Sequence, residues 1–533
     1  MREPLRVTVS GGEYDDVLRR LTEEKFASRL AATDATLWGD EAEAEASIRL
    51  NWVGLHESSR PLLAEIDALR ADLWGEGLDR VVLCGMGGSS LAPEVITRTF
   101  DADLVVLDST APSAVARATG TDLERTVVVV SSKSGGTVET DSQRRAFVEA
   151  FTAAGIDAAS RIVAITDPGS PLSELAAKAG YRKVFHADPN VGGRYSALTA
   201  FGLVPSGLAG VDVSDLLDEA DEVAPELFTD SPDNPALRLG AWLAASPGRD
   251  KAVLTDAGSG IAGFPDWAEQ LISESTGKHG TGVLPAAVES PVAPELGHPA
   301  DDVILGLLVH AEGPEAPAPP APTARVSGPL GAQFLLWEVA TAVAGRLLGI
   351  NPFDQPDVES AKAATRALLD ERPESDPPAF VDGPVEVRGS ADLLGGARTV
   401  GAAVDALLAR LGDDGYLAVM AYLDSGRYQA LVDVRAALAR RTSRPVTFGW
   451  GPRFLHSTGQ YHKGGPPTGV FLQITGDPGD DVAIPGRPFG FATLLAAQAA
   501  GDATVLTGLG RPVLRLHLTD VDAGSSALRD AVR

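Results

Sequence analysis

Cysteine is nearly absent from this sequence of 533 residues, in which Cys84 is the only one. A single thiol excludes an internal disulfide and a zinc site built from cysteines. Basic residues are also scarce: 45 lysines and arginines stand against 73 aspartates and glutamates, for a formal net charge of −28. This balance argues against a nucleic-acid-binding protein, which would need a basic patch, although a local site can still be positive and bind an anion.

Long hydrophobic runs are missing as well. The N-terminus lacks the apolar core of a signal peptide. The most apolar helical stretch, residues 334–350, is interrupted by Glu338 and Arg346, so we expect no membrane span. The expectation is a soluble cytoplasmic protein that binds neither membranes nor nucleic acids.

The common nucleotide and metal motifs are also lacking. No G-x-x-x-x-G-K-[ST] sequence occurs, and residues 85–90, G-M-G-G-S-S, lack the third glycine of the Rossmann fingerprint. Asp108 lies at a distance that suits a ribose contact, so a nucleotide site is the less favoured alternative. No cluster of His, Asp and Glu has ligand spacing, so we expect neither a metal nor a cofactor.

Four continuous apolar runs stand out in the first half of the chain. Each ends in small polar residues and leads into a helical stretch; they are residues 80–84, 104–107, 126–130 and 161–166. Such runs indicate a parallel sheet that is covered on both faces. We therefore expect a doubly wound α/β domain over residues 76–205.

The rest of the chain divides into three further parts. Apolar residues at three- and four-residue spacing predict a helical N-terminal layer over residues 1–75. A second α/β domain is expected over residues 206–370, with strands at 251–256 and 303–309, a Pro/Ala loop at 314–322 and a helix at 330–348. Residues 371–533 are expected to form an additional C-terminal α/β segment, with strands at 416–422, 445–448, 470–474 and 513–516 and a helix at 428–441.

Glycine- and serine-rich turns follow two of the predicted strands. Gly88 and Ser89 lie in the first turn, and the second turn contains Ser132, Lys133, Ser134, Gly135, Gly136 and Thr137. Ligands of such sheets bind at the carboxyl ends of the strands, where backbone N–H groups and hydroxyls suit a phosphate. The alternative is that these residues only cap helices.

Charged residues in three later stretches suit catalysis on such a ligand. Arg194 follows two glycines, and a fixed guanidinium can stabilise a phosphate or a developing enolate. Gln270, Glu274 and Lys278 fall on one face of a helix, although a Glu–Lys pair at this spacing is often a surface pair. Lys362 lies just inside a helix that follows the turn at residues 350–357.

Taken in order, these stretches resemble the glucose-6-phosphate isomerase family. That family carries five motifs that appear here at residues 85–89, 132–137, 192–196, 274–278 and 353–362, so the resemblance covers about residues 80–365. Residues 451–465, G-P-R-F-L-H-S-T-G-Q-Y-H-K-G-G, look like the isomerase half of fused transaldolase/glucose-6-phosphate isomerase proteins. The fold that the resemblance implies is two doubly wound sugar-isomerase (SIS-type) parallel-sheet domains.

The resemblance also implies a role for each motif residue. Glu274 would be the base between C1 and C2, Arg194 would stabilise the enediolate, and Lys362 would assist at the ring oxygen or the phosphate. The substrate-binding residues would be Gly88, Ser89, Ser132, Lys133, Ser134, Gly135, Gly136, Thr137 and Gln270. Gly135, Gly136 and Asp357 depart from the family pattern. The ring-opening histidine has no clear counterpart: His298 is near the expected place, with His456 and His462 as rivals.

The activity implied is the isomerisation of glucose 6-phosphate and fructose 6-phosphate, a step of glycolysis and gluconeogenesis, by a homodimer without a cofactor. Contacts to the phosphate would supply binding energy at a distance from the carbons that react. Two alternatives remain open. The protein could isomerise another sugar phosphate, such as mannose 6-phosphate, or it could be a non-catalytic sensor of sugar phosphates.

Overall fold

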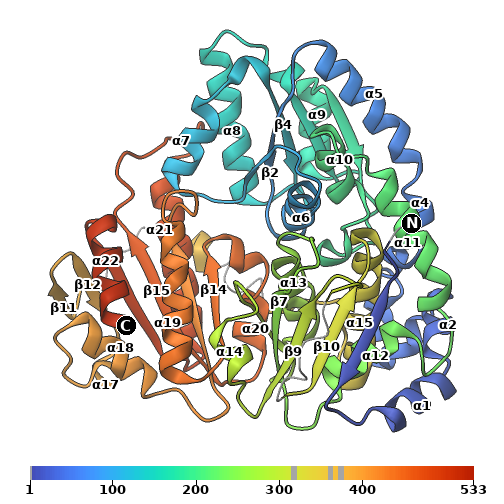
Figure 1. Ribbon diagram of the computed structural model, residues 1–533. Helices are drawn as coiled ribbons and strands as arrows, with labels where there is room; N and C mark the ends of the chain where they lie inside the picture. The colour runs from blue at the N-terminus through green and yellow to red at the C-terminus, as the bar shows by residue number, and fades with distance from the viewer. Residues whose placement is uncertain (1–2, 314–320, 358–363, 370–376) are drawn as a thin grey trace.

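The computed structural model describes residues 3–313, 321–357, 364–369 and 377–533. Its strands form three sheets that follow one another along the chain, apart from the first strand, which joins the second sheet, and helices pack around each sheet (Figure 1). The fold is mixed α/β with largely parallel sheets, as the sequence predicts. The boundaries drawn from the sequence at residues 75, 205 and 370 remain predictions.

The first sheet is entirely parallel, in the order β3-β2-β4-β5-β6. Its strands are β2 (Arg80–Cys84), β3 (Leu104–Leu107), β4 (Thr126–Ser131), β5 (Ile162–Thr166) and β6 (Lys183–His186). Along β4, Val127 and Val129 enter one hydrophobic cluster while Val128 and Val130 enter another. Because alternate side chains point to opposite faces, both faces are buried, which explains the continuous apolar runs in the sequence.

Helices cover both faces of this sheet. They are α6 (Leu91–Thr99), α7 (Pro112–Gly120), α8 (Val138–Ala153), α9 (Pro171–Ala179) and α10 (Ala200–Leu208). Residues of α6 and α10 belong to the cluster on one face, and residues of α7 and α8 belong to the cluster on the other. The expectation of a doubly wound arrangement is therefore confirmed for this sheet.

The second sheet has the order β1-β10-β9-β7-β8. Its strands are β1 (Arg6–Ser10), β7 (Lys251–Asp256), β8 (Leu284–Ala287), β9 (Val303–Leu308) and β10 (Thr323–Ser327). Only β1 is antiparallel to its neighbour. The prediction of helices throughout residues 1–75 is wrong for β1, where Val7 and Val9 alternate with polar residues and pack inward from the edge of the sheet.

Helices of the N-terminal layer and of the second unit pack around this sheet, except α5 (Pro61–Gly75), which packs against α10 of the first unit. The layer contains α1 (Asp15–Glu23), α2 (Phe26–Ala31), α3 (Asp40–Ala46), α4 (Leu55–Ser58) and α5. The second unit contains α11 (Ser214–Leu227), α12 (Pro235–Ala244), α13 (Phe264–Thr276), α14 (Pro294–Gly297) and α15 (Leu330–Leu348). The predicted helix at 330–348 is confirmed as α15.

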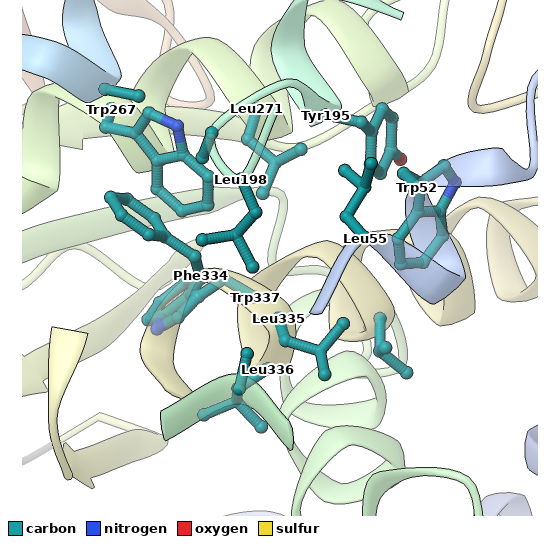
Figure 2. Packing of buried hydrophobic residues seen from close by; sticks show 14 of the residues in the cluster. Trp52, Leu55, Tyr195, Leu198, Trp267, Leu271, Phe334, Leu335, Leu336 and Trp337 are labelled. Carbon is teal, nitrogen blue, oxygen red and sulfur yellow. The ribbon is translucent and has the colours of Figure 1, made fainter. Parts of the chain in front are cut away.

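Aromatic side chains join these elements into one core (Figure 2). The rings of Trp267 on α13 and Phe334 on α15 meet edge to face, with centroids 4.7 Å apart. Tyr195 stacks on Trp52 of the N-terminal layer at 5.0 Å. Such pairs fix the relative position of the elements that carry them. As a result, α13 and the turn at Tyr195, which both carry predicted site residues, are held rigidly.

The third sheet has the order β11-β12-β16-β15-β13-β14. Its strands are β11 (Phe380–Asp382), β12 (Val385–Arg388), β13 (Tyr416–Tyr422), β14 (Val446–Trp450), β15 (Gly469–Gly476) and β16 (Val513–Leu518). The last four are parallel, and β11 and β12 add an antiparallel edge. Its helices are α17 (Ala391–Leu394), α18 (Val400–Leu408), α19 (Asp433–Thr442), α20 (Gly459–Gly464), α21 (Phe491–Gly508) and α22 (Val521–Val532).

The C-terminal unit shares a core with the first unit. Phe147 and Phe151 of α8 belong to the same hydrophobic cluster as Phe491 and Leu494 of α21. The carboxylate of Asp424, which follows β13, forms an ion pair with Arg117 of α7 at 2.8 Å. The two units are therefore packed together as one body. Within the described residues, no helix is both long enough and apolar enough to cross a membrane.

Candidate active site

Two short 3₁₀ turns, η3 (Gly87–Ser89) after β2 and η6 (Gly193–Tyr195), bring separate parts of the chain together. A Cβ atom at Gly88 would overlap the carbonyl oxygen of Gly193, so only glycine allows the two backbones to approach this closely. A Cβ atom on Gly87 would lie 2.6 Å from the carbonyl oxygen of His456. The predicted sugar-binding turn therefore lies between η6 and a turn of the C-terminal unit.

The serine-rich loop connects β4 to the N-terminus of α8. The hydroxyls of Ser132 and Thr137 lie 2.9 Å apart, and the backbone N–H of Gly136 donates to Ser134 Oγ at 3.2 Å. Gly135 has a φ of +66° and sits against the backbone of Leu172, which favours glycine there. The departure of this sequence from the family pattern at Gly135 thus has a structural reason. The loop presents hydroxyls at a helix N-terminus, which suits a phosphate.

Lys133 is part of the loop, but its ammonium points to a structural partner. Its Nζ lies 2.8 Å from Asp167 Oδ2 and donates to the carbonyl oxygen of Pro189 at 3.1 Å. Burial raises the pKa of Asp167, and the ammonium of Lys133 opposes that shift. The carbonyl oxygen of Lys133 also accepts a hydrogen bond, from the backbone N–H of Asp167 at 3.1 Å. The predicted contact of Lys133 with the substrate stays a prediction.

The guanidinium of Arg194 is buried and held on three sides. Its Nε donates to Ser275 Oγ at 2.8 Å. Its Nη2 donates to the carbonyl oxygens of Pro352 and Asp354 at 2.6 and 3.0 Å. Its Nη1 lies 3.8 Å from Glu274 Oε2. These contacts aim one edge of the cation at the carboxylate that the sequence marks as a base.

Glu274 lies near the C-terminal end of α13 and is buried. The amide of Gln270, one turn earlier, donates from Nε2 to Glu274 Oε2 at 3.3 Å and to the carbonyl oxygen of His456 at 2.8 Å. Gln270 Oε1 is buried and accepts no hydrogen bond from any described residue. A buried acceptor without a donor is costly, and a substrate hydroxyl would satisfy it.

The chain turns away from the helix before Lys278. α13 ends at Thr276, and a Cβ at Gly277 would overlap Tyr461. The ammonium of Lys278 donates to the carbonyl oxygens of Asn351 and Asp354, each at 2.7 Å. Burial, followed by the charge of Arg194, lowers the pKa of Lys278 to about 8. Lys278 therefore holds the same loop that binds Arg194.

Comparison with known proteins identifies the family. A model of the phosphoglucose isomerase family matches residues 63–284. A probable glucose-6-phosphate isomerase of Haloarcula marismortui is 30% identical over 345 residues, which cover 55% of this chain and 78% of the relative. The chain belongs to the glucose-6-phosphate isomerase family. A glucose-6-phosphate isomerase of Cyanothece sp. is 30% identical over 312 residues, but the match covers only 58% of that relative.

Two solved structures share the fold of this chain. A hypothetical protein from Thermus thermophilus is 26% identical with a TM-score of 0.57, over 69% of this chain and 100% of that chain. A glucose-6-phosphate isomerase from Chlamydia trachomatis has the same fold, with 19% identity and a TM-score of 0.55 over 68% of this chain and 86% of that chain. The likeness to fused transaldolase proteins stays a prediction.

Of the three candidate histidines, His456 is the one that lies at the site. It ends the turn η8 (Arg453–His456), and its Nε2 lies 3.1 Å from Glu139 Oε1. A carboxylate only accepts hydrogen bonds, so Nε2 carries the proton and Nδ1 is the nitrogen left for a ligand. The sequence motif at residues 451–465 indicates His456 as a candidate, but no sequence pattern predicts its contact with Glu139.

The other two histidines lie elsewhere. The structure does not bring His298 to the site: it is exposed at the end of α14, and residues 299–301 line a groove with α18 and α19. α14 packs against α19 of the C-terminal unit, so within the described part of this chain a catalytic role of His298 stays a prediction without a contact to support it. His462 is buried, and its Nδ1 lies 3.0 Å from the hydroxyl of Tyr416. Burial lowers the pKa of His462 to about 3, so the ring stays neutral.

Lys362, the remaining predicted catalytic residue, lies outside the described residues. The segment that precedes it is tied to the site. Gln355 Oε1 accepts a hydrogen bond from Arg194 at 3.4 Å. The backbone N–H of Asp357 donates to Gln460 Oε1 at 3.0 Å, and Gln460 Nε2 donates back to Asp357 Oδ2 at 2.7 Å. Asp357, the second departure from the family pattern, thus anchors this segment on α20.

One group of described residues has the spacing of metal ligands. His56, Glu57 and Asp221 have ligand atoms within 4.8 Å of one another. They lie where the N-terminal layer meets α11, and Arg60 Nη2 lies 3.6 Å from Asp221 Oδ2. A guanidinium at this distance already balances the carboxylate, so we assign no ion to this group.

Proposed function

We propose that this protein is a glucose-6-phosphate isomerase that interconverts glucose 6-phosphate and fructose 6-phosphate through a cis-enediolate. The observation that carries the proposal is the pairing of a buried carboxylate, Glu274, with the guanidinium of Arg194 at 3.8 Å. A base next to a fixed cation suits proton abstraction beside a carbonyl group.

Substrate binding begins with the phosphate. The hydroxyls of Ser132, Ser134 and Thr137 and the N-terminus of α8 form an anion-binding loop. Gly136 has no side chain, and the space beside it is open, which lets the phosphate approach the backbone. Gly88 and Ser89 would contact the sugar, and Gln270 Oε1 would accept a hydrogen bond from a hydroxyl group of the sugar. Binding at the phosphate then orients the carbons near Glu274.

Ring opening is assigned to His456. With its Nε2–H donated to Glu139, its Nδ1 can take the proton of the anomeric hydroxyl and return a proton to the ring oxygen. The C1–O5 bond breaks as the C1 carbonyl forms. Lys362 would assist at the ring oxygen or the phosphate, as the family resemblance implies.

Glu274 then transfers a proton between two carbons. Starting from the open aldose, its carboxylate removes the proton from C2, the C1–C2 double bond forms, and negative charge develops on O1. The guanidinium of Arg194 offsets that charge. The proton on O2 moves to O1, and Glu274 returns its proton to C1, which leaves the carbonyl group on C2. Every proton removed is returned, so the reaction needs no redox partner.

The wider setting is part of the proposal. The resemblance supports a cytoplasmic homodimer that acts in glycolysis and gluconeogenesis. The C-terminal unit of the same chain supplies His456, whose carbonyl oxygen binds Gln270 beside Glu274. We therefore propose that the Glu274 and His456 of one site belong to the same subunit of the dimer.

A coupled assay tests the proposal. Purified protein is given fructose 6-phosphate, and glucose 6-phosphate is measured with its dehydrogenase, with EDTA present throughout. We expect turnover in the wild type and a loss of at least about 100-fold in Glu274→Gln, because general bases contribute this much or more. Binding of the sugar phosphate should persist in that variant, since the phosphate loop is unchanged.

The matched control is Glu269→Gln on the same helix. Burial and the charge of Asp266 raise the pKa of Glu269 to about 8, so its carboxyl is mainly protonated at pH 7 and an amide imitates it. This variant should stay active. A wild type that binds the sugar phosphate without turnover would favour the sensor, and turnover with mannose 6-phosphate in the same assay would broaden the substrate class.

A further inference from the structure

We infer that Gln498 and Thr110 are positioning residues that hold Glu139 against the ring-opening histidine, His456. This inference rests on the proposed function and adds residues outside the motifs that carry the family resemblance. Gln498 lies on α21 of the C-terminal unit, well beyond residues 63–284, where the family model matches. Thr110 follows β3 of the first unit.

The argument begins at one carboxylate oxygen. Glu139 Oε1 lies 3.1 Å from His456 Nε2 and also accepts a hydrogen bond from Gln498 Nε2 at 2.7 Å. The bond to Gln498 is the shorter and is fully buried, whereas the imidazole is partly exposed. Gln498 therefore fixes the oxygen to which the imidazole is bound.

Thr110 determines which way the amide of Gln498 faces. Its hydroxyl lies 2.7 Å from Gln498 Oε1 and donates to it. An amide whose oxygen is held in this way can present only its NH₂ group to Glu139. Both side chains are buried, so water cannot replace either bond without a change in packing.

The consequence concerns the proton on His456. A carboxylate in a fixed position keeps the proton on Nε2 and leaves Nδ1 free to exchange protons with the sugar. Without the amide, Glu139 loses the shorter of these two hydrogen bonds, and the imidazole can take the other tautomer or turn. Ring opening should then slow, while the proton transfer by Glu274 on the open chain should not.

The two steps are measured separately by NMR. Exchange between the α and β anomers of glucose 6-phosphate requires only ring opening and closing, whereas isomerisation also requires Glu274. We expect Gln498→Met to slow both anomer exchange and isomerisation by about tenfold, because loss of a residue that orients a functional histidine commonly lowers activity by this factor. Thr110→Val should slow both by less, because it leaves the amide of Gln498 in place. KM should change little, because the phosphate loop is untouched.

The matched control is Gln473→Met. Gln473 is equally buried in the C-terminal unit and donates to the carbonyl oxygen of Ala499 on the same helix, α21, at 2.8 Å. This variant loses one buried amide bond to α21 without touching Glu139. If Gln498→Met slows anomer exchange no more than Gln473→Met does, the positioning role is refuted.

Gln498→Glu supplies a readout that a packing defect would not reproduce. The new carboxyl would face Glu139 and would have to hold a proton to donate to it, because two adjacent carboxylates cannot both be ionised cheaply. Its activity relative to the wild type should therefore rise as the pH falls from about 8 to about 5.5. A flat ratio across this range would contradict the inference.

One measurement does not need turnover. In protein labelled with ¹⁵N-histidine, the Nε2–H resonance of His456 reports its bond to Glu139 directly. We expect it to shift or broaden in Gln498→Met and to persist in Gln473→Met. An unchanged resonance in Gln498→Met would overturn the inference even if the wild type proved inactive, while failure of the proposed function would appear separately as a wild type without isomerase activity.

Discussion

Lys278 is a buried cation beside a second cation, and it binds the loop on which Arg194 depends. Its ammonium contacts the carbonyl oxygens of Asn351 and Asp354 and the carboxylate of Asp354 at 2.6 Å. The carbonyl oxygen of Asp354 also binds Arg194. Loss of the ammonium should therefore move the guanidinium relative to Glu274, and we expect Lys278→Met to lower kcat/KM by at least about tenfold.

The pH dependence of this effect has a defined sign. The pKa of Lys278 is about 8 in the folded protein, below its usual value of 10.5. As pH rises through about 8 the ammonium loses its proton, and kcat/KM should fall. Between about pH 8 and pH 10.5, Lys278 holds its proton more fully in the unfolded chain than in the folded protein. Its ionisation therefore makes the free energy of unfolding rise with pH in this range. Activity should thus fall without alkaline unfolding.

Rate profiles from pH 7 to 10, with circular dichroism on the same samples, check this prediction. The alkaline decline should be absent from Lys278→Met. Lys251→Met is the control, because Lys251 is also buried and paired, at 2.8 Å from Asp302, but lies away from the site. A decline that persists in Lys278→Met would assign the titration to another group.

Sequence patterns were informative for residues within one segment and silent about contacts between segments. The helical spacing of Gln270 and Glu274 correctly placed them on one face of α13. The contact between His456 and Glu139 spans more than 300 residues, and no periodicity records such a pairing. The contact of Ser275 with Arg194 was not predictable either. Its hydroxyl accepts a hydrogen bond from the guanidinium, but nothing in the sequence distinguishes it from other helical serines.

At the scale of elements, Arg453 is one of the anchors of the turn η8. Arg453, its first residue, lies 2.6 Å from Glu94 Oε2 and 3.0 Å from Asp108 Oδ2 in the first unit. Burial disfavours the charged guanidinium, but the two carboxylates outweigh it and raise the pKa of Arg453. This ion cluster therefore fixes the turn that ends at His456.

We expect Arg453→Met to lower the free energy of unfolding by about 3 kcal/mol near neutral pH, because it leaves two buried carboxylates without a counter-ion. The deficit should shrink towards pH 5, where those carboxylates can take up protons. Denaturant unfolding at both pH values checks this. Arg125→Met removes an exposed pair with Asp79, which solvent screens, and should cost much less; an equal cost for both variants would contradict this prediction.

The elements that sequence reasoning missed are mostly those at sheet edges. Central strands such as β4 and β13 are buried on both faces, and their uninterrupted apolar runs identify them. β6, β8 and β11 lie at or near edges, are three or four residues long, and include charged, proline or exposed residues. An edge strand needs only one neighbour and less apolar surface, so its sequence carries a weaker signal.

At the scale of the whole molecule, the C-terminal unit closes the site from the same chain. It contributes His456, whose carbonyl oxygen binds Gln270, and Ser457, whose carbonyl oxygen binds Ser273. It is also joined to the first unit through a shared hydrophobic cluster. The parts that surround Glu274 in the described residues therefore stay together whether or not the protein dimerises.

Complementation between inactive variants tests this arrangement. Glu274→Gln and His456→Asn are each expected to lose activity, and mixtures of the two, unfolded and refolded together, are expected to stay inactive, because no site in a mixed dimer would hold both wild-type residues. If subunits exchanged the C-terminal unit, about a quarter of the sites would recover both residues in a mixture dominated by random dimers. Recovery of activity would therefore show that His456 acts on the neighbouring subunit. Continued inactivity, together with a specific activity of the wild type that is constant from about 10 µM to about 1 nM, would show that one chain suffices.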